Sequence, residues 1–163
     1  MIQDLKQMGY LIERENRKRQ LYQKKALLER WITAYPEQLR PKLLINRYQS
    51  VVPNWWQQAQ LNTNTYWGGE IAAAMLTHYL KPMIATVYIK QSVGEFVLKN
   101  RLRKMPQGEI LETFWGFEYH QPPYNIVPPL LIYADLIATG NARNIETARI
   151  IYEKEIVGLI QAS

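Results

Sequence analysis

Three glutamates and one lysine in the middle of the chain are the residue types from which a divalent-metal nuclease builds its active site: Glu70, Glu95, Glu112 and Lys99. In such enzymes two acids converge on the metal ion and a lysine lies near the attacking water. The usual pattern is Glu-x-Lys on one strand, but Thr113-Phe114 follow Glu112, and Lys99 lies four residues after Glu95. We therefore expect no bound metal ion and no catalytic residue. A metal-dependent nuclease that uses these four side chains is the alternative.

Other residues that could do chemistry are sparse. The chain has two aspartates, Asp4 and Asp135, no cysteine, and two histidines without ligand spacing, His78 and His120. Thiolate nucleophiles and cysteine-bound zinc are thereby excluded. Glu70 stands at the predicted start of a helix, where a negative charge is favourable. We expect a protein that uses no cofactor and is not an enzyme.

The positive charge is concentrated near the N-terminus. Residues 1–50 hold 11 Lys and Arg against 5 acids, and the remaining residues hold nine of each. This asymmetry indicates either a module that meets a polyanion or a well-solvated surface segment. Six of these cations are our candidates for DNA contact: Arg14, Arg17, Lys18, Arg19, Lys24 and Lys25.

The first cations lie on a predicted hairpin. Residues 9–13 and 20–22 favour two short strands, and the polar run 15–19 favours the turn between them. A basic hairpin tip is typical of the wing with which a winged helix contacts DNA phosphates. Because only Ile2 to Met8 precede the hairpin, we expect a partial winged helix without its recognition helix.

A helical connector follows the hairpin. Apolar residues recur on one face of a helix from Lys24, and Pro36 is expected to end it. A second, short helix is expected through Leu39, and the connector cations, Arg30 and Arg40 among them, are expected on a solvated face. These features divide the chain into residues 1–47, a winged-helix remnant and connector, and residues 48–163, the main domain.

The main domain is predicted to have an α+β fold. Its expected elements are a helix over 71–80, strands over 83–89, 95–103 and 109–119, and helices that start near Pro129 and Asn144. The turn 105–108 suggests that the second and third strands pair, and a fourth strand within 120–128 is an open alternative. A helix, a three-stranded mixed or antiparallel sheet and two final helices resemble a restriction-endonuclease-like core.

Two further groups are candidates for partner binding. Lys99, Arg101 and Arg103 lie together on the predicted strand 95–103, where they either shield a sheet edge or contact a protein; nucleic acid is the alternative. Trp55 and Trp56 are candidate interface anchors.

Nothing in the chain favours a membrane or an export signal. The longest strongly apolar stretch, residues 127–138, is too short to span a bilayer, and the N-terminus lacks the layout of a signal peptide. We expect a cytoplasmic protein.

Three stretches resemble one known family. They are residues 9–31, the run Tyr66-Trp67-Gly68-Gly69-Glu70-Ile71-Ala72-Ala73, and residues 127–148 with Pro128-Pro129-Leu130-Leu131-Ile132-Tyr133-Ala134-Asp135. They are similar to the AbiEi family, the antitoxin and transcriptional regulator of type IV toxin–antitoxin systems. The resemblance implies an N-terminal winged helix that binds promoter DNA and a C-terminal domain that counteracts a nucleotidyltransferase toxin. It also implies a structural, non-catalytic Asp135; oligomer formation is open.

Overall fold

A four-stranded mixed sheet forms the centre of the molecule. The computed structural model describes residues 2–14, 18–90, 92–117 and 119–161 of the chain. The strand order is β3-β8-β6-β5, in which β6 and β8 are parallel and the other pairs are antiparallel. The strands span Leu44–Asn46 (β3), Glu109–Glu112 (β8), Thr86–Ile89 (β6) and Thr65–Gly68 (β5). All four residues of β6 are buried, which confirms the predicted central strand, although it begins at Thr86 rather than at residue 83.

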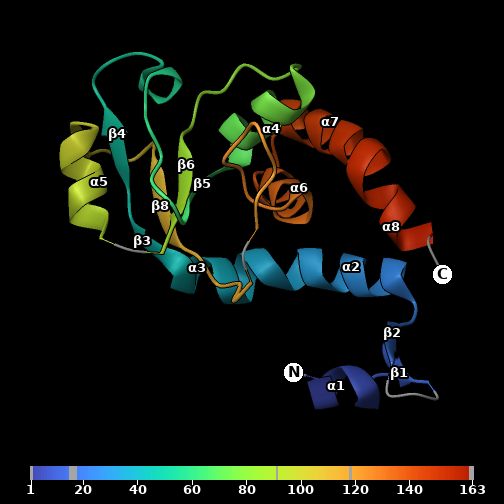
Figure 1. The fold of residues 1–163 in the computed structure, drawn as a ribbon. Helices are drawn as coiled ribbons and strands as arrows, with labels where there is room; N and C mark the ends of the chain where they lie inside the picture. Colours follow the sequence, from blue (N-terminus) through green and yellow to red (C-terminus); the bar gives the residue numbers. More distant parts are fainter. Residues whose placement is uncertain (1, 15–17, 91, 118, 162–163) are drawn as a thin grey trace.

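Helices cover the sheet on one side. The helices α4 (Gly69–Thr77), α6 (Pro129–Ala138) and α7 (Ala142–Ile151) pack on one another, and α4 and α6 contact the sheet strands (Figure 1). A π-helical turn (Tyr152–Ile156) and α8 (Val157–Gln161) extend α7. The two predicted C-terminal helices are confirmed. The second of them, α7, starts slightly before the predicted Asn144: its N-cap is Asn141, whose side chain accepts hydrogen bonds from the Arg143 and Asn144 amides.

The predicted strand over residues 95–103 is wrong. Val93–Lys99 form a helix, α5, whose N-cap Ser92 accepts a hydrogen bond from the Glu95 amide. Val93, Phe96 and Val97 recur at helical spacing, and Phe96 is buried. Leu98, which alternates with Phe96 as in a strand, is 80% exposed. Sequence pattern alone does not separate these two outcomes in so short a segment.

The predicted pairing of the second and third strands is also wrong. The strand β7 (Leu102–Lys104) pairs with β4 (Tyr48–Ser50) in a separate two-stranded sheet, whereas β8 pairs with β3 and β6. The predicted third strand extends only to Glu112. Beyond it Trp115 packs on Tyr66 and Tyr88, whereas Phe114 and Phe117 are exposed. Within 120–128 the described residues contribute one parallel bridge to the sheet, Trp67 to Ile126, instead of a full strand.

The N-terminal region lies at one end of the molecule. It consists of α1 (Ile2–Gln7), the hairpin strands β1 (Leu11–Glu13) and β2 (Arg19–Leu21), and α2 (Lys24–Ala34) (Figure 1). The predicted hairpin is confirmed, with Leu11 opposite Leu21. In the same view, α2 runs beneath the main domain toward the sheet, and α5 lies at the far end.

The predicted helix end at Pro36 is wrong. A π-helical turn (Tyr35–Leu39) and α3 (Arg40–Leu43) continue directly from α2. Pro36 stands in the first turn of the π-helical segment. In a π-type turn the backbone hydrogen bonds join residues five apart instead of four, so a different amide has to donate and the missing N–H of proline is tolerated. In the described part of the chain, no helix is long and apolar enough to cross a bilayer.

Candidate functional site

A buried aspartate joins the connector to the main domain. Asp135 on α6 accepts hydrogen bonds from the Tyr35 hydroxyl (3.1 Å), the Arg40 Nε (2.9 Å) and the Tyr88 hydroxyl (2.6 Å). Arg40 Nη1 also donates to Glu109 on β8 at 2.6 Å. These five residues form what we call the Asp135 cluster. It links the π-helical turn, α3, β6, β8 and α6.

Burial controls the electrostatics of this cluster. It raises the pKa of the Asp135 carboxyl, although Arg40 and the two hydroxyls oppose the shift. Burial and then the negative charge of Asp135 raise the pKa of Tyr88 and Tyr35. Burial alone would lower the pKa of Arg40, but its two acidic partners outweigh burial and raise it. The guanidinium therefore stays charged, and both phenols stay protonated.

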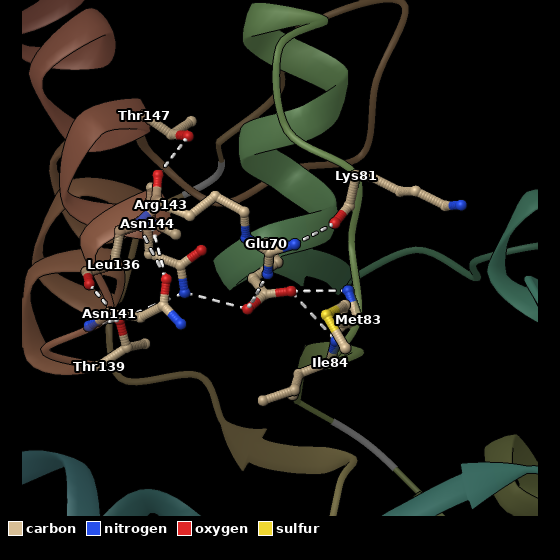
Figure 2. A network of polar contacts seen from close by, with 10 residues as sticks. All are labelled: Glu70, Lys81, Met83, Ile84, Leu136, Thr139, Asn141, Arg143, Asn144 and Thr147. Atoms are coloured by element: carbon tan, nitrogen blue, oxygen red, sulfur yellow. Dashed lines mark hydrogen bonds and ion pairs between the residues drawn. The ribbon is translucent and has the colours of Figure 1, made fainter.

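A second network is centred on Glu70 at the start of α4 (Figure 2). Its Oε2 accepts hydrogen bonds from the Met83 amide (2.7 Å) and the Ile84 amide (3.2 Å). Its Oε1 accepts from Asn144 Nδ2 (3.0 Å) and from Arg143 Nη2 (3.3 Å) on α7. The Glu70 carboxylate thus connects α4 to the chain before β6 and to α7. This structural role comes in addition to the favourable position of its negative charge at the helix start, which the sequence predicted.

The two networks line the same small cavity, of about 30 Å³. Its walls include Arg40, Glu70, Thr86, Glu109, Asp135 and Thr139. Gly69 adopts φ +50° beside it, and a Cβ on Gly69 would lie 2.8 Å from the Thr86 hydroxyl. The glycine is therefore needed both for its left-handed conformation and for the close approach of α4 to β6. The carboxylates around this cavity are already hydrogen-bonded, so the arrangement holds elements together.

The acids considered for a nuclease do not come together. Glu70 is in the network above, Glu95 lies on the exposed side of α5, and Glu112 ends β8. Lys99 at the end of α5 donates to Asn62 Oδ1 at 3.3 Å. Over the residues that the structure describes, no three His, Cys, Asp or Glu side chains form a group that could hold a metal ion.

The candidate DNA contacts gather at the hairpin and at the first turn of α2. Arg14, Lys18, Arg19 and Lys25 are exposed, whereas Lys24 is half-buried and donates to the Leu159 carbonyl at 3.2 Å. Arg17 lies outside the described residues.

The candidate partner contacts lie at the opposite end. Lys99, Arg101 and Arg103 are exposed at the end of α5 and along β7. Trp55 and Trp56 are half-buried in a short 3₁₀ turn, and Trp55 packs edge-on against Trp67 and Phe96. At least one of the two indoles therefore serves the core.

Sequence reasoning missed the role of Arg40. We expected it on a solvated face, but it is the cation of the Asp135 cluster and its side chain is largely buried. The available signal was Asp135 itself, a lone acid in an otherwise apolar helix, because a buried carboxylate needs donors. Its position gave no indication of which cation would supply them.

A comparison with models of known protein families shows to which family the chain belongs. A family model described as "Transcriptional regulator, AbiEi antitoxin, Type IV TA system" matches residues 20–157. The chain belongs to the AbiEi antitoxin family. The AbiEi match runs from β2 into α8, so it contains the Asp135 cluster and the Glu70 network. The resemblance inferred from the sequence is thereby confirmed. No curated protein and no solved structure matches the chain.

Proposed function

We propose that this chain is a cytoplasmic regulatory antitoxin that contacts DNA through its N-terminal cations and neutralises a nucleotidyltransferase toxin through its main domain. The observation that carries the proposal is the separation of charge along the fold. Exposed cations gather on the hairpin and the start of α2, while the described acids of the central cavity are paired in the interior, with Arg40 of the connector and with Arg143. Membership of the AbiEi family supports both activities.

The hairpin acts as the wing of a partial winged helix. Arg14, Lys18 and Arg19 flank its turn, and Arg17 is added from the sequence. Cations in this position neutralise phosphates and release counterions, which gives affinity without reading bases. In this proposal residues 1–47 fix the protein on DNA, and they contribute little sequence preference.

The main domain, residues 48–163, supplies the antitoxin activity. We assign it a restriction-endonuclease-like core in which the carboxylates hold helices together. Lys99, Arg101 and Arg103, with Trp55 and Trp56, are the proposed partner contacts. Lys99 ends α5 and Trp55 packs on Phe96 of the same helix, and α5 lies at the end of the molecule remote from the hairpin (Figure 1). In this proposal DNA and a protein partner therefore do not compete for the same surface.

Salt-dependent DNA binding tests the first half of the proposal. We would measure fluorescence anisotropy of a duplex from upstream of the gene, in a series of salt concentrations. The Lys18→Ala/Arg19→Ala/Lys25→Ala variant should lower the log–log salt slope by about 0.9 for each phosphate that it no longer neutralises. The matched control is Lys81→Ala/Lys90→Ala, which removes exposed cations from the main domain. Equal slopes for wild type and the triple variant would rule out the hairpin as the DNA-binding element.

Co-expression tests the second half. The nucleotidyltransferase toxin encoded beside the gene would be expressed with wild type, with the triple hairpin variant, or with Lys99→Ala/Arg101→Ala/Arg103→Ala. Wild type and the hairpin variant should restore growth, and the second triple variant should restore less. If wild type leaves the cells arrested although the protein accumulates, the antitoxin assignment is wrong.

A further inference from the structure

A pocket of about 510 Å³ lies on the main domain between the chain that follows β4 and the chain that precedes β6. Residues 49–56 line one side of it, with Trp55 and Trp56 among them, and residues 82–85 line another. Met105, which follows β7, completes the lining. We call it the Met83 pocket.

The Met83 pocket exposes large apolar side chains to water. Met83 is 72% exposed, Val51 62% and Val52 51%. Apolar side chains that gather on a surface usually mark a binding site, and Trp and Met are enriched at the centre of protein interfaces. The composition of this lining is therefore that of a protein-binding pocket.

The part of the chain that builds the pocket is strongly basic. Residues 47–108 contain seven Lys and Arg but two acids, Glu70 and Glu95. All seven cations are exposed, whereas Glu70 is buried and paired with Arg143. An anionic occupant would therefore meet little repulsion from this segment.

The strand register places one of these cations beside the pocket. Gln49 of β4 lines the pocket, and Arg103 of β7 is its direct partner in the antiparallel pair. Side chains directly opposite each other in such a pair project to the same face. Arg103 is exposed, and no hydrogen bond or ion pair joins its side chain to the rest of the described chain. Its guanidinium is free to bind a carboxylate.

These two features together define the chemistry of an occupant. The lining provides apolar contacts, and Arg103 provides a positive charge next to them. We propose that the Met83 pocket binds a segment of a protein partner in which one large apolar side chain is flanked by Asp and Glu. The apolar side chain enters the pocket, and an acid pairs with Arg103.

The lining favours a protein segment over a single-stranded nucleic acid. Bases bind through aromatic faces on which they stack, in addition to cations for the phosphates. Val51, Val52 and Met83 offer no such faces, and Trp55 is already packed edge-on against Trp67 and Phe96.

The inference deepens the proposed function and rests on it, because that function places a protein partner on this part of the main domain. The two can fail separately. Loss of growth rescue in the co-expression assay would refute the antitoxin function, whereas the peptide measurements below need neither the toxin nor DNA.

Selection from a phage-displayed library of random short peptides, on the immobilised full chain, tests the proposal. We expect enrichment of peptides that carry Leu, Ile, Met or Phe between acidic residues. Fluorescence polarisation then measures the affinity of an enriched peptide. Replacing its apolar residue with Ser should weaken binding about ten-fold, and replacing its acids with Asn and Gln should also remove most of the salt dependence.

Two pairs of variants locate the site. Met83→Ala should weaken the peptide about five-fold, whereas the control Leu159→Ala alters a side chain of similar exposure, 69%, that does not line the pocket. Arg103→Ala should weaken it about five-fold as well. Its control is Lys104→Ala, which removes the next cation on the same strand, where the side chain projects to the other face. Both controls should bind as wild type does, and circular dichroism should show all four variants folded.

Three results would overturn the proposal. The first is a selection that enriches no acidic peptide with an apolar residue, or equal binding by wild type, Met83→Ala and Arg103→Ala. The second is a single-stranded oligonucleotide that binds in dependence on Arg103 and displaces no peptide, which would make the occupant a nucleic acid. The third is a wild-type dimer in sedimentation that Met83→Ala converts to monomer, which would make the pocket an interface between two copies.

Discussion

The Asp135 cluster and the basic hairpin differ in the environment of their charges: the charges of the cluster are buried and paired, and those of the hairpin are exposed. In the cluster, one carboxylate receives donors from three side chains inside the fold, and its guanidinium partner has a second acid. On the hairpin, Arg14 and Lys18 project into solvent, and Arg19 approaches Glu13 only at 3.9 Å. Buried charges must be fully paired or they destabilise the fold, whereas exposed charges contribute little to it. The first region therefore determines stability, and the second is free to serve binding.

The largest expected effect comes from removing the centre of the cluster. Asp135→Ala leaves Tyr35, Tyr88 and Arg40 without their shared acceptor, so we expect a loss of about 3–5 kcal/mol in the free energy of unfolding. Urea denaturation measures it. Glu153→Gln, which alters an exposed acid near the C-terminus, is the control and should stay within about 0.5 kcal/mol of wild type. A loss below about 1 kcal/mol for Asp135→Ala would mean that the cluster is not the main polar anchor.

Two glycine substitutions test the packing beside the cluster. Gly69→Ala forces a Cβ to within 2.8 Å of the Thr86 hydroxyl at φ +50°, and should cost about 1–3 kcal/mol. Gly94→Ala introduces the same group into helix α5, where nothing lies within 4 Å, and should gain about 0.5–1 kcal/mol. Thermal unfolding of both variants gives the comparison. A neutral or stabilising shift for Gly69→Ala would show that close approach of α4 to β6 is not required.

The pH dependence of stability sharpens the account of Asp135. Because burial raises the pKa of its carboxyl above 3.8, the folded protein retains a proton that the unfolded chain has already released. The contribution of the Asp135 carboxyl to the free energy of unfolding is therefore fully present below about pH 4. It declines as the pH rises through the raised pKa of the folded protein. The free energy of unfolding of wild type minus that of Asp135→Asn, which cannot titrate there, should fall over this window. A difference that grows with pH would show that the carboxyl is instead held ionised.

The smallest expected effect on stability belongs to the hairpin. Lys18→Ala/Arg19→Ala should change the free energy of unfolding by less than about 0.5 kcal/mol, because both side chains are exposed. Urea denaturation next to the DNA-binding assay separates the two roles. A destabilisation of several kcal/mol would show that the hairpin cations belong to the fold and would remove the contrast between the two regions.

Regular hydrophobic patterns made part of this fold predictable. The central strand β6 has apolar or β-branched residues on both faces, and α6 follows a Pro-Pro pair with an apolar face and ends before Gly140. The hairpin was recognisable from its polar turn between two short apolar runs. In each of these segments the spacing of the apolar residues fits only one type of secondary structure, and tertiary packing favours the same type.

The segments that were mispredicted are short or decided by distant partners. In α5, a pattern of seven residues fits both a strand and a helix, and Ser92 as N-cap decides for the helix. The strand β5 was missed because Tyr66-Trp67-Gly68 pairs with β6, a contact that the segment itself does not indicate. The acceptors of Arg40, 69 and 95 positions away in the chain, are likewise set by the tertiary fold.

One continuous helical rod connects the two regions compared above. From Lys24 to Leu43 the chain passes through α2, the π-helical turn and α3 without a break, a length of about 30 Å. Tyr35 and Arg40 fasten the far half of this rod to the sheet and to α6, while the near end carries the hairpin. The contacts of Tyr35 and Arg40 in the core thus help to determine the direction in which the hairpin points. A substitution at Arg40 would therefore change the orientation of the hairpin without altering any residue on it.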